Sequence, residues 1–165
     1  MDWIDELSDA WDREYPELDV SVLPPLVRLA RLTVLLEGFQ HDVLEPFELT
    51  ASDYSVLAAL RRAGPPYALN PSQLTSRLHR SSGGMTKMLK RLEHRGLVAQ
   101  RPDPDDGRGS VFSLTRRGLA IQDRVFHAFL TASQDVLAPL PSTRRRELER
   151  SLRALLDVFE NRGAE

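Results

Sequence analysis

The sequence predicts a mainly α-helical fold with one small β-hairpin. Apolar residues recur at helical spacing through most of the 165 residues, and glycine or proline stands where most of these patterns end. Two short strand-like runs, LVAQRP and SVFSLT, flank the turn-forming segment PDPDDGRG. This arrangement is typical of a hairpin with an extended tip.

The composition indicates one globular domain without thiol chemistry. Hydrophobic residues make up 41% and charged residues 28% of the chain, which suits a folded protein of this length. There is no cysteine, so disulfides, thiolate zinc sites and cysteine redox switches are excluded. The chain begins with the acidic segment MDWIDELSDAWDRE, and no run approaches the roughly 20 apolar residues of a membrane span. We therefore expect a cytoplasmic protein with no membrane partner.

The charge is distributed unevenly along the chain. Residues 71–117 contain ten Lys or Arg against four Asp or Glu, a net charge of +6. Because the whole chain carries −2, the remaining residues carry −8. A polyanionic partner is therefore expected to bind the basic middle segment.

Three helices are expected before the basic segment. Residues 2–14 form a short amphipathic helix that Pro16 stops. A long helix with a wide apolar face follows over 24–45, and a third helix over 50–64 begins at Thr50, whose hydroxyl can cap it. The third helix is expected to face the core with Tyr54, Leu57 and Leu60.

The basic segment contains a short helix, a tight turn and a second helix. The run NPSQ provides a cap, a first-turn proline and a capping-box partner for the short helix. After the turn, a helix capped by Ser81 or Ser82 is expected to end at Gly96. Its buried side follows the i, i+3, i+4, i+7 pattern of Met85, Met88, Leu89 and Leu92. Beyond the hairpin, one helix is expected over 116–137 and a last one after PLPS.

This order of elements is the layout of a winged helix-turn-helix, which consists of a short helix, a tight turn, a second helix and a basic hairpin. The second helix of such a fold enters the major groove of DNA. Opposite its apolar side, this helix presents small and cationic residues that can approach phosphates and donate to guanine. Arg108 at the hairpin tip, braced by Asp106, can enter a narrow minor groove. The candidate DNA contacts are Ser81, Ser82, Thr86, Lys87, Lys90, Arg91, Asp106 and Arg108.

Four motifs connect this layout to a known family. They are a serine-rich start of the second helix, the exit L-x-x-x-G-L-V at 92–98, the wing pattern Asp-x-Arg at 106–108 and the restart S-L-T-x-x-G at 113–118. The segment that carries them resembles the DNA-binding core of MarR-family regulators, and the resemblance covers most of residues 21–162. It implies a sequence-specific double-stranded DNA-binding transcriptional regulator, a ligand-responsive repressor that acts as a homodimer on a pseudo-palindromic operator.

The flanking helices are expected to join two subunits. The resemblance implies an acidic extra helix over 1–20, dimerisation helices over 21–48 and 116–165, and a winged helix-turn-helix region over 49–115, all in one intertwined domain. The apolar stripes of the long helices give an independent reason to expect a homodimer, because one small core could not cover them.

The acidic start of the chain resembles the extra N-terminal helix of the urate-responsive branch of this family. That branch holds its ligand with a tryptophan, two arginines and an aspartate, and the aligned residues here are Trp11, Tyr15, Ser55 and Met88. The groups that would pair with an anionic purine are thus replaced. We expect no cofactor. Either a small aromatic or apolar effector binds here, or Trp3 and Trp11 only pack the leader helix onto the dimer.

Other functions find less support in the sequence. An enzyme would need a nucleophile with a base, paired acids or a phosphate-binding loop, and Gly83 and Gly84 lack the lysine and spacing of such a loop. His41 stands near Asp42 and Glu45 without a second well-placed histidine, so no metal is expected. The remaining alternative is a winged-helix module that binds an acidic protein and has no operator specificity.

Overall fold

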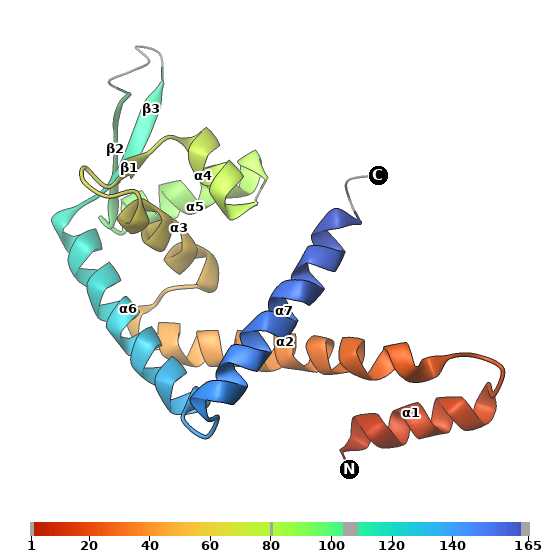
Figure 1. Cartoon of the computed structure of the whole chain (residues 1–165). Coiled ribbons are helices and arrows are strands. Elements are labelled where there is room, and N and C mark those ends of the chain that lie inside the picture. The colour runs from red at the N-terminus through yellow and green to blue at the C-terminus, as the bar shows by residue number, and fades with distance from the viewer. Residues whose placement is uncertain (1, 80, 104–108, 163–165) are drawn as a thin grey trace. The chain divides into compact units, whose positions relative to one another are not determined.

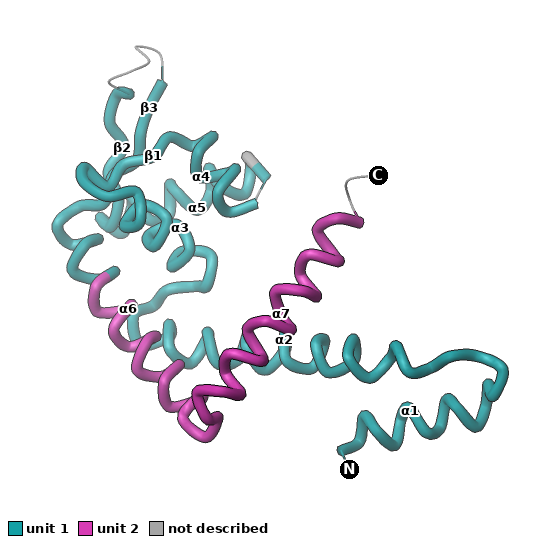
Figure 2. The backbone as a smooth tube through the Cα atoms, in the orientation of Figure 1, with its two compact units in different colours: residues 1–122 teal, residues 123–165 magenta. Residues whose placement is uncertain are grey.

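The structure is a computed structural model that describes residues 2–79, 81–103 and 109–162. It divides into two compact units, residues 1–122 and residues 123–165 (Figure 2). The mainly helical fold with a small antiparallel sheet agrees with the prediction. The elements are α1 Trp3–Glu14, a 3-10 helix Val20–Val22, α2 Leu23–Leu44, a 3-10 helix Glu45–Phe47, α3 Ala51–Arg62, β1 Ala68–Leu69, α4 Pro71–Leu78, α5 Ser82–His94, β2 Val98–Pro102, β3 Ser110–Leu114, α6 Arg116–Leu137 and α7 Ser142–Asn161 (Figure 1).

Helix α1 folds back along α2 and is held there by one ion-pair cluster (Figure 1). Asp2 and Asp5 form a capping box at the start of α1. Arg28 of α2 donates from Nη2 to Asp2 Oδ1 at 3.0 Å and to Asp5 Oδ1 at 2.5 Å. Ile4 is the buried residue of α1. The leader helix is therefore attached by a short apolar contact and a charge cluster that needs both carboxylates ionised.

Acid is expected to loosen α1 before it affects the rest of the protein. The hydrogen bond from Arg28, followed by that from the Asp2 amide, lowers the pKa of Asp5 below its ordinary 3.8. The contribution of a carboxylate with a lowered pKa is complete above its ordinary value and is lost as the pH falls through the lowered one. Trp3 and Trp11, the two tryptophans of the chain, both lie on α1. Tryptophan fluorescence anisotropy should thus fall below a pH of about 4, before the far-ultraviolet circular dichroism changes.

The matched control for this titration is Arg28→Gln. This variant should show the lower anisotropy already at neutral pH, because the guanidinium that holds both carboxylates is missing. An anisotropy that changes only together with the circular dichroism would contradict the attachment described here.

The core of the first unit lies between α3, α4, α5 and the sheet (Figure 1). Helix α3 begins with the capping box of Thr50 and Asp53 and buries Leu57 and Leu60, as expected. Tyr54, also expected to face the core, is only half-buried. The largest apolar side chains that are almost fully buried here are Val56, Leu57, Leu60, Leu74, Met85, Leu89, Leu92, Leu97 and Val98.

The sheet has the strand order β1-β3-β2, with antiparallel pairs throughout. Strands β2 and β3 form the predicted hairpin, in which Val98 pairs with Leu114 and Pro102 with Ser110. Strand β1 was not predicted, because two residues carry no alternating pattern and their pairing depends on distant β3. The predicted tip residues Asp106 and Arg108 lie outside the described residues.

A compact hydrogen-bonded junction joins the hairpin to α6. The Thr115 hydroxyl donates to the Gly96 carbonyl at 2.7 Å, and the Thr115 amide donates to the Leu97 carbonyl at 3.1 Å. The Gly118 amide then donates to the Thr115 hydroxyl at 2.9 Å. The junction thus links the exit of α5 to the start of α6, and it explains why threonine and glycine occupy their places in the S-L-T-x-x-G pattern.

Large apolar side chains are exposed on helices of both units. Helix α2 buries only Leu44 among its residues, and no residue of α7 is buried. None of the described helices is long and apolar enough to span a membrane. The exposed apolar residues are Leu26, Leu32, Val34, Leu35 and Leu36 on α2, Phe126, Leu130, Val136 and Leu137 on α6, and Leu148, Leu152, Leu156, Val158 and Phe159 on α7.

Candidate nucleic-acid interface

Helix α5 has one apolar and one polar side, as the sequence predicts. Met85, Leu89 and Leu92 are buried against the core, and Met88 is 8% exposed. The opposite side consists of exposed residues only. These are Gly83, Thr86, Lys87, Lys90 and His94. Since α4 packs against α5, the pair forms the helix-turn-helix and α5 takes the place of the recognition helix.

The start of α5 differs from the expected capping pattern. Ser81, one of the two predicted alternatives, is the N-cap residue, but its side chain makes no capping hydrogen bond within the described residues. Ser82 is the first helical residue, and its side chain lies outside the described part of the structure. The Ser81 hydroxyl and the first-turn amides of α5 therefore remain suited to a phosphate oxygen.

Lys87 and Lys90 are the cations that α5 directs away from the core. Both are exposed, and within the described residues neither ammonium group makes an ion pair or hydrogen bond. Thr86 lies beside them on the same side. Such groups can donate to guanine or to phosphate oxygens.

Arg91, also predicted to contact DNA, is bound inside the protein. Its Nε and Nη2 atoms donate to Asp53 Oδ1 at 3.1 Å and 2.5 Å, and Nη2 lies 3.5 Å from the Thr50 hydroxyl. Asp53 is only 1% exposed. The side chain of Arg91 is half exposed, so its contact with DNA stays a prediction while its bond to Asp53 is a feature of the structure.

Arg95, one turn later, was not among the predicted functional residues. It donates to the carbonyl oxygens of Phe47 and Glu48, and its Nη2 lies 3.5 Å from the Glu48 carboxylate. The partners are 47 and 48 residues away in the sequence. No local pattern could therefore have indicated these contacts.

Three of the four predicted effector residues lie on three different helices, and Tyr15 directly follows α1. At the end of α1, the ring centroids of Trp11 and of the C-cap residue Tyr15 are 5.7 Å apart. Ser55 on α3 donates its hydroxyl proton to the Ala51 carbonyl at 2.8 Å, and Met88 belongs to the buried side of α5. The structure thus brings Trp11 and Tyr15 together, whereas Ser55 and Met88 lie on other elements.

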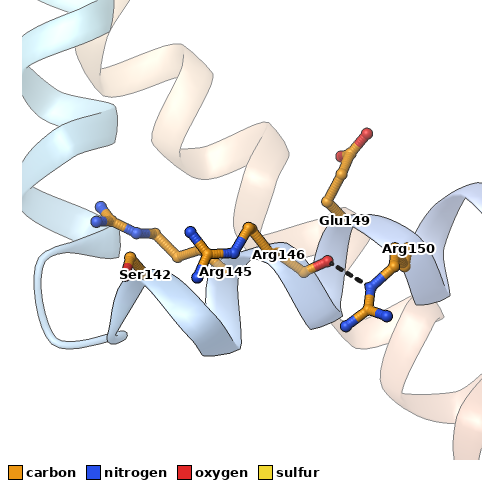
Figure 3. A pocket seen from close by; sticks show the side chains of 5 residues that line it. All are labelled: Ser142, Arg145, Arg146, Glu149 and Arg150. Carbon is orange, nitrogen blue, oxygen red and sulfur yellow. Dashed lines mark hydrogen bonds between the residues drawn. The ribbon is translucent and has the colours of Figure 1, made fainter.

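None of these four residues lines the hollows that described residues form, among them a small one of about 230 Å³ between α1 and the first 3-10 helix, two of whose lining residues are Ser8 and Asp19. A hollow of about 460 Å³ lies beside the connection from α2 to α3 and is lined by Glu37, Gln40, His41, Glu45, Glu48, Leu49, Thr50 and Ala51. A shallow one of about 620 Å³ on α7 is lined by Ser142, Arg145, Arg146, Glu149 and Arg150 (Figure 3). The described ranges contain no group of three His, Asp or Glu that could hold a metal ion.

Comparison with known proteins identifies the family. Residues 47–109, from the end of the 3-10 helix that follows α2 to the hairpin, match the model of the MarR family. The HTH-type transcriptional regulator PecS of Dickeya dadantii is 32% identical over 157 residues, which cover 95% of this chain and 92% of PecS. The chain belongs to the MarR family.

Two MarR proteins are also similar to this chain, one compared by sequence and one by structure. The multiple antibiotic resistance protein MarR of Salmonella typhimurium is 36% identical over 100 residues, which cover 58% of this chain and 67% of that protein. The crystal structure of a mutant MarR from E. coli complexed with operator DNA matches with a TM-score of 0.70 and 28% identity, over 82% of this chain and 96% of that one. This MarR-family member is a transcriptional regulator with the predicted winged helix-turn-helix fold.

Proposed function

We propose that this MarR-family regulator binds double-stranded DNA sequence-specifically, with α5 in the major groove. The observation that carries the proposal is the exposed side of α5, where Lys87 and Lys90 stand opposite a fully packed apolar side. The similar MarR structure in complex with operator DNA supports the same use of the fold. Ser81, Ser82 and Thr86 complete the contacts from α5, and Asp106 and Arg108 extend them from the hairpin tip.

The regulator acts as a homodimer on a pseudo-palindromic operator. Support comes from the exposed apolar side chains of α2, α6 and α7, which need a partner surface to leave water. A twofold dimer places its recognition helices about 34 Å apart, one turn of DNA. The regulator is located in the cytoplasm. It represses transcription because the bound dimer occupies a promoter.

A small aromatic or apolar effector is proposed for the same protein, with Trp11 and Tyr15 as its aromatic contacts and Ser55 and Met88 as its other contacts. The pair of rings at the end of α1 supports an aromatic ligand over an anionic one, because no arginine stands at Tyr15 or Met88. Equilibrium binding of urate and of neutral phenols tests this point. Tighter binding of urate would refute it.

The main test is a binding titration with duplexes from upstream of the regulator's own gene and its divergent neighbour, in the presence of scrambled competitor. We expect competitor-resistant binding of a dimer, and weaker binding by Arg108→Ala, because an arginine in the minor groove is lost. Binding without preference for any of these duplexes would instead favour the protein-interaction module that the sequence left open.

A further inference from the structure

We propose that Asp53 is a positioning residue for DNA recognition, which fixes the orientation of α5 by holding Arg91. The inference rests on the DNA-binding function proposed above. It also gives Arg91 a role inside the protein, in place of the phosphate or base contact that the sequence predicts.

The Asp53 carboxylate is buried and shared between two helices. Its Oδ2 accepts hydrogen bonds from the Thr50 amide at 3.2 Å and from the Thr50 hydroxyl at 2.9 Å, which begin α3. Its Oδ1 accepts both hydrogen bonds from Arg91 of α5. A buried carboxylate is stable only when it is paired and hydrogen-bonded in this way. The carboxylate therefore holds Arg91 in one place.

Arg95 makes a second attachment one turn further along α5. It binds the carbonyl oxygens of Phe47 and Glu48, at the end of the 3-10 helix that follows α2. Glu48 has a φ of 54°, so the chain turns sharply at the point where Arg95 holds it. Together the two arginines fix α5 to the first turn of α3 and to the connection that precedes it, independently of the α4–α5 turn.

The position of this attachment determines what it controls. Arg91 directly follows Lys90 and lies one turn after Lys87, so any rotation of α5 about its axis moves both lysines. Hydrogen bonds to base edges need a donor–acceptor distance near 3 Å, whereas attraction to phosphates falls off over about 10 Å. Loss of the attachment should therefore weaken binding to the operator and leave binding to other DNA almost unchanged.

The test compares Asp53→Asn, Arg91→Gln and Asp53→Asn/Arg91→Gln with the wild type on operator and scrambled duplexes, over a series of salt concentrations. Each single variant should lose about tenfold in operator affinity, a usual size for coupling between linked sites. Affinity for scrambled DNA and the salt slope should stay at the wild-type values. The double variant should lose no more than Arg91→Gln alone, because both substitutions remove one interaction.

The matched control is Lys90→Gln, which removes a neighbouring cation from the DNA-facing side. It should reduce the slope of log K against log salt by about 0.9 and weaken binding to both duplexes. The same pattern in Arg91→Gln would overturn the proposal, since it would show that Arg91 contacts phosphate. An equal loss on both duplexes in Asp53→Asn, with a smaller active fraction, would also overturn it, since the role would then be structural only.

A readout without DNA separates this inference from the proposed function. If the wild type shows no preference for the operator, the function proposed above is wrong. Amide hydrogen exchange then tests independently whether Asp53 fixes the position of α5. Asp53→Asn should accelerate exchange in α5 while α1, which packs on α2, keeps its wild-type rates. Unchanged exchange in α5 would overturn the positioning role.

Discussion

Replacement of Lys87 and Lys90 together by alanine is expected to weaken operator binding roughly 100-fold, since each good base contact contributes roughly 1 to 3 kcal/mol. Both ammonium groups lie on the exposed side of α5, and neither is paired within the described residues. Their removal therefore costs the fold little. A duplex titration by fluorescence anisotropy measures the effect, and circular dichroism should show an unchanged melting temperature.

The control carries the same change in charge at another place. Arg145 and Arg146 are exposed neighbours on α7, in the second unit (Figure 3). Their joint replacement by alanine should leave operator affinity within about twofold of the wild type, because exposed charges that make no contact with DNA are screened by salt. If this control loses as much affinity as the lysine variant, overall charge rather than the α5 surface would account for binding.

Gly118→Ala is expected to destabilise the protein by about 3 kcal/mol. A Cβ atom at Gly118 would overlap the carbonyl oxygen of Leu97 and lie 2.9 Å from its carbonyl carbon. Both are backbone atoms of the junction that links α5 to α6, so neither can turn aside as a side chain would. The melting temperature should fall by about 10 °C, at 2–4 °C per kcal/mol for a chain of this size.

Gly83→Ala serves as the comparison for this substitution. Gly83 is also helical, and a Cβ atom there would meet nothing within 4 Å apart from its chain neighbours and the backbone of its own helix. The methyl group should raise stability by about 0.5 to 1 kcal/mol, because alanine loses less conformational freedom in a helix than glycine. An equal drop in melting temperature for both variants would contradict the steric explanation.

Local patterns accounted for the helices because each helix carries its own signals. The residues that form each signal lie close together in the sequence. Examples are the capping boxes at Thr50 and Asn70 and the stripe of apolar residues along α5. Strand β1 has no such signal, since its two residues become a strand only by pairing with β3. The hairpin and the apolar side of α5 could thus be predicted, and the third strand could not.

The sequence predicted the exposed lysines of the candidate site but not the hydrogen bonds that its arginines make within the protein. Periodicity places Lys87 and Lys90 opposite the core, but Arg91 falls at the boundary between the two sides of α5. Its partner Asp53 is 38 residues away, and no local pattern connects the two residues. Long-range ion pairs of this kind depend on the packing of α3 against α5, and no sequence motif indicates that packing.

The internal use of Arg91 and Arg95 also bears on how many molecules a cell needs. Two of the cations of α5 bind Asp53 and the backbone of Phe47 and Glu48. If the positioning role inferred for this attachment holds, they do not bind phosphates at random positions of the chromosome. Millions of such positions compete with one operator for every regulator molecule. If part of the charge of the recognition helix is bound inside the protein, fewer regulator molecules are held at these competing positions. A smaller number of dimers then keeps the promoter occupied.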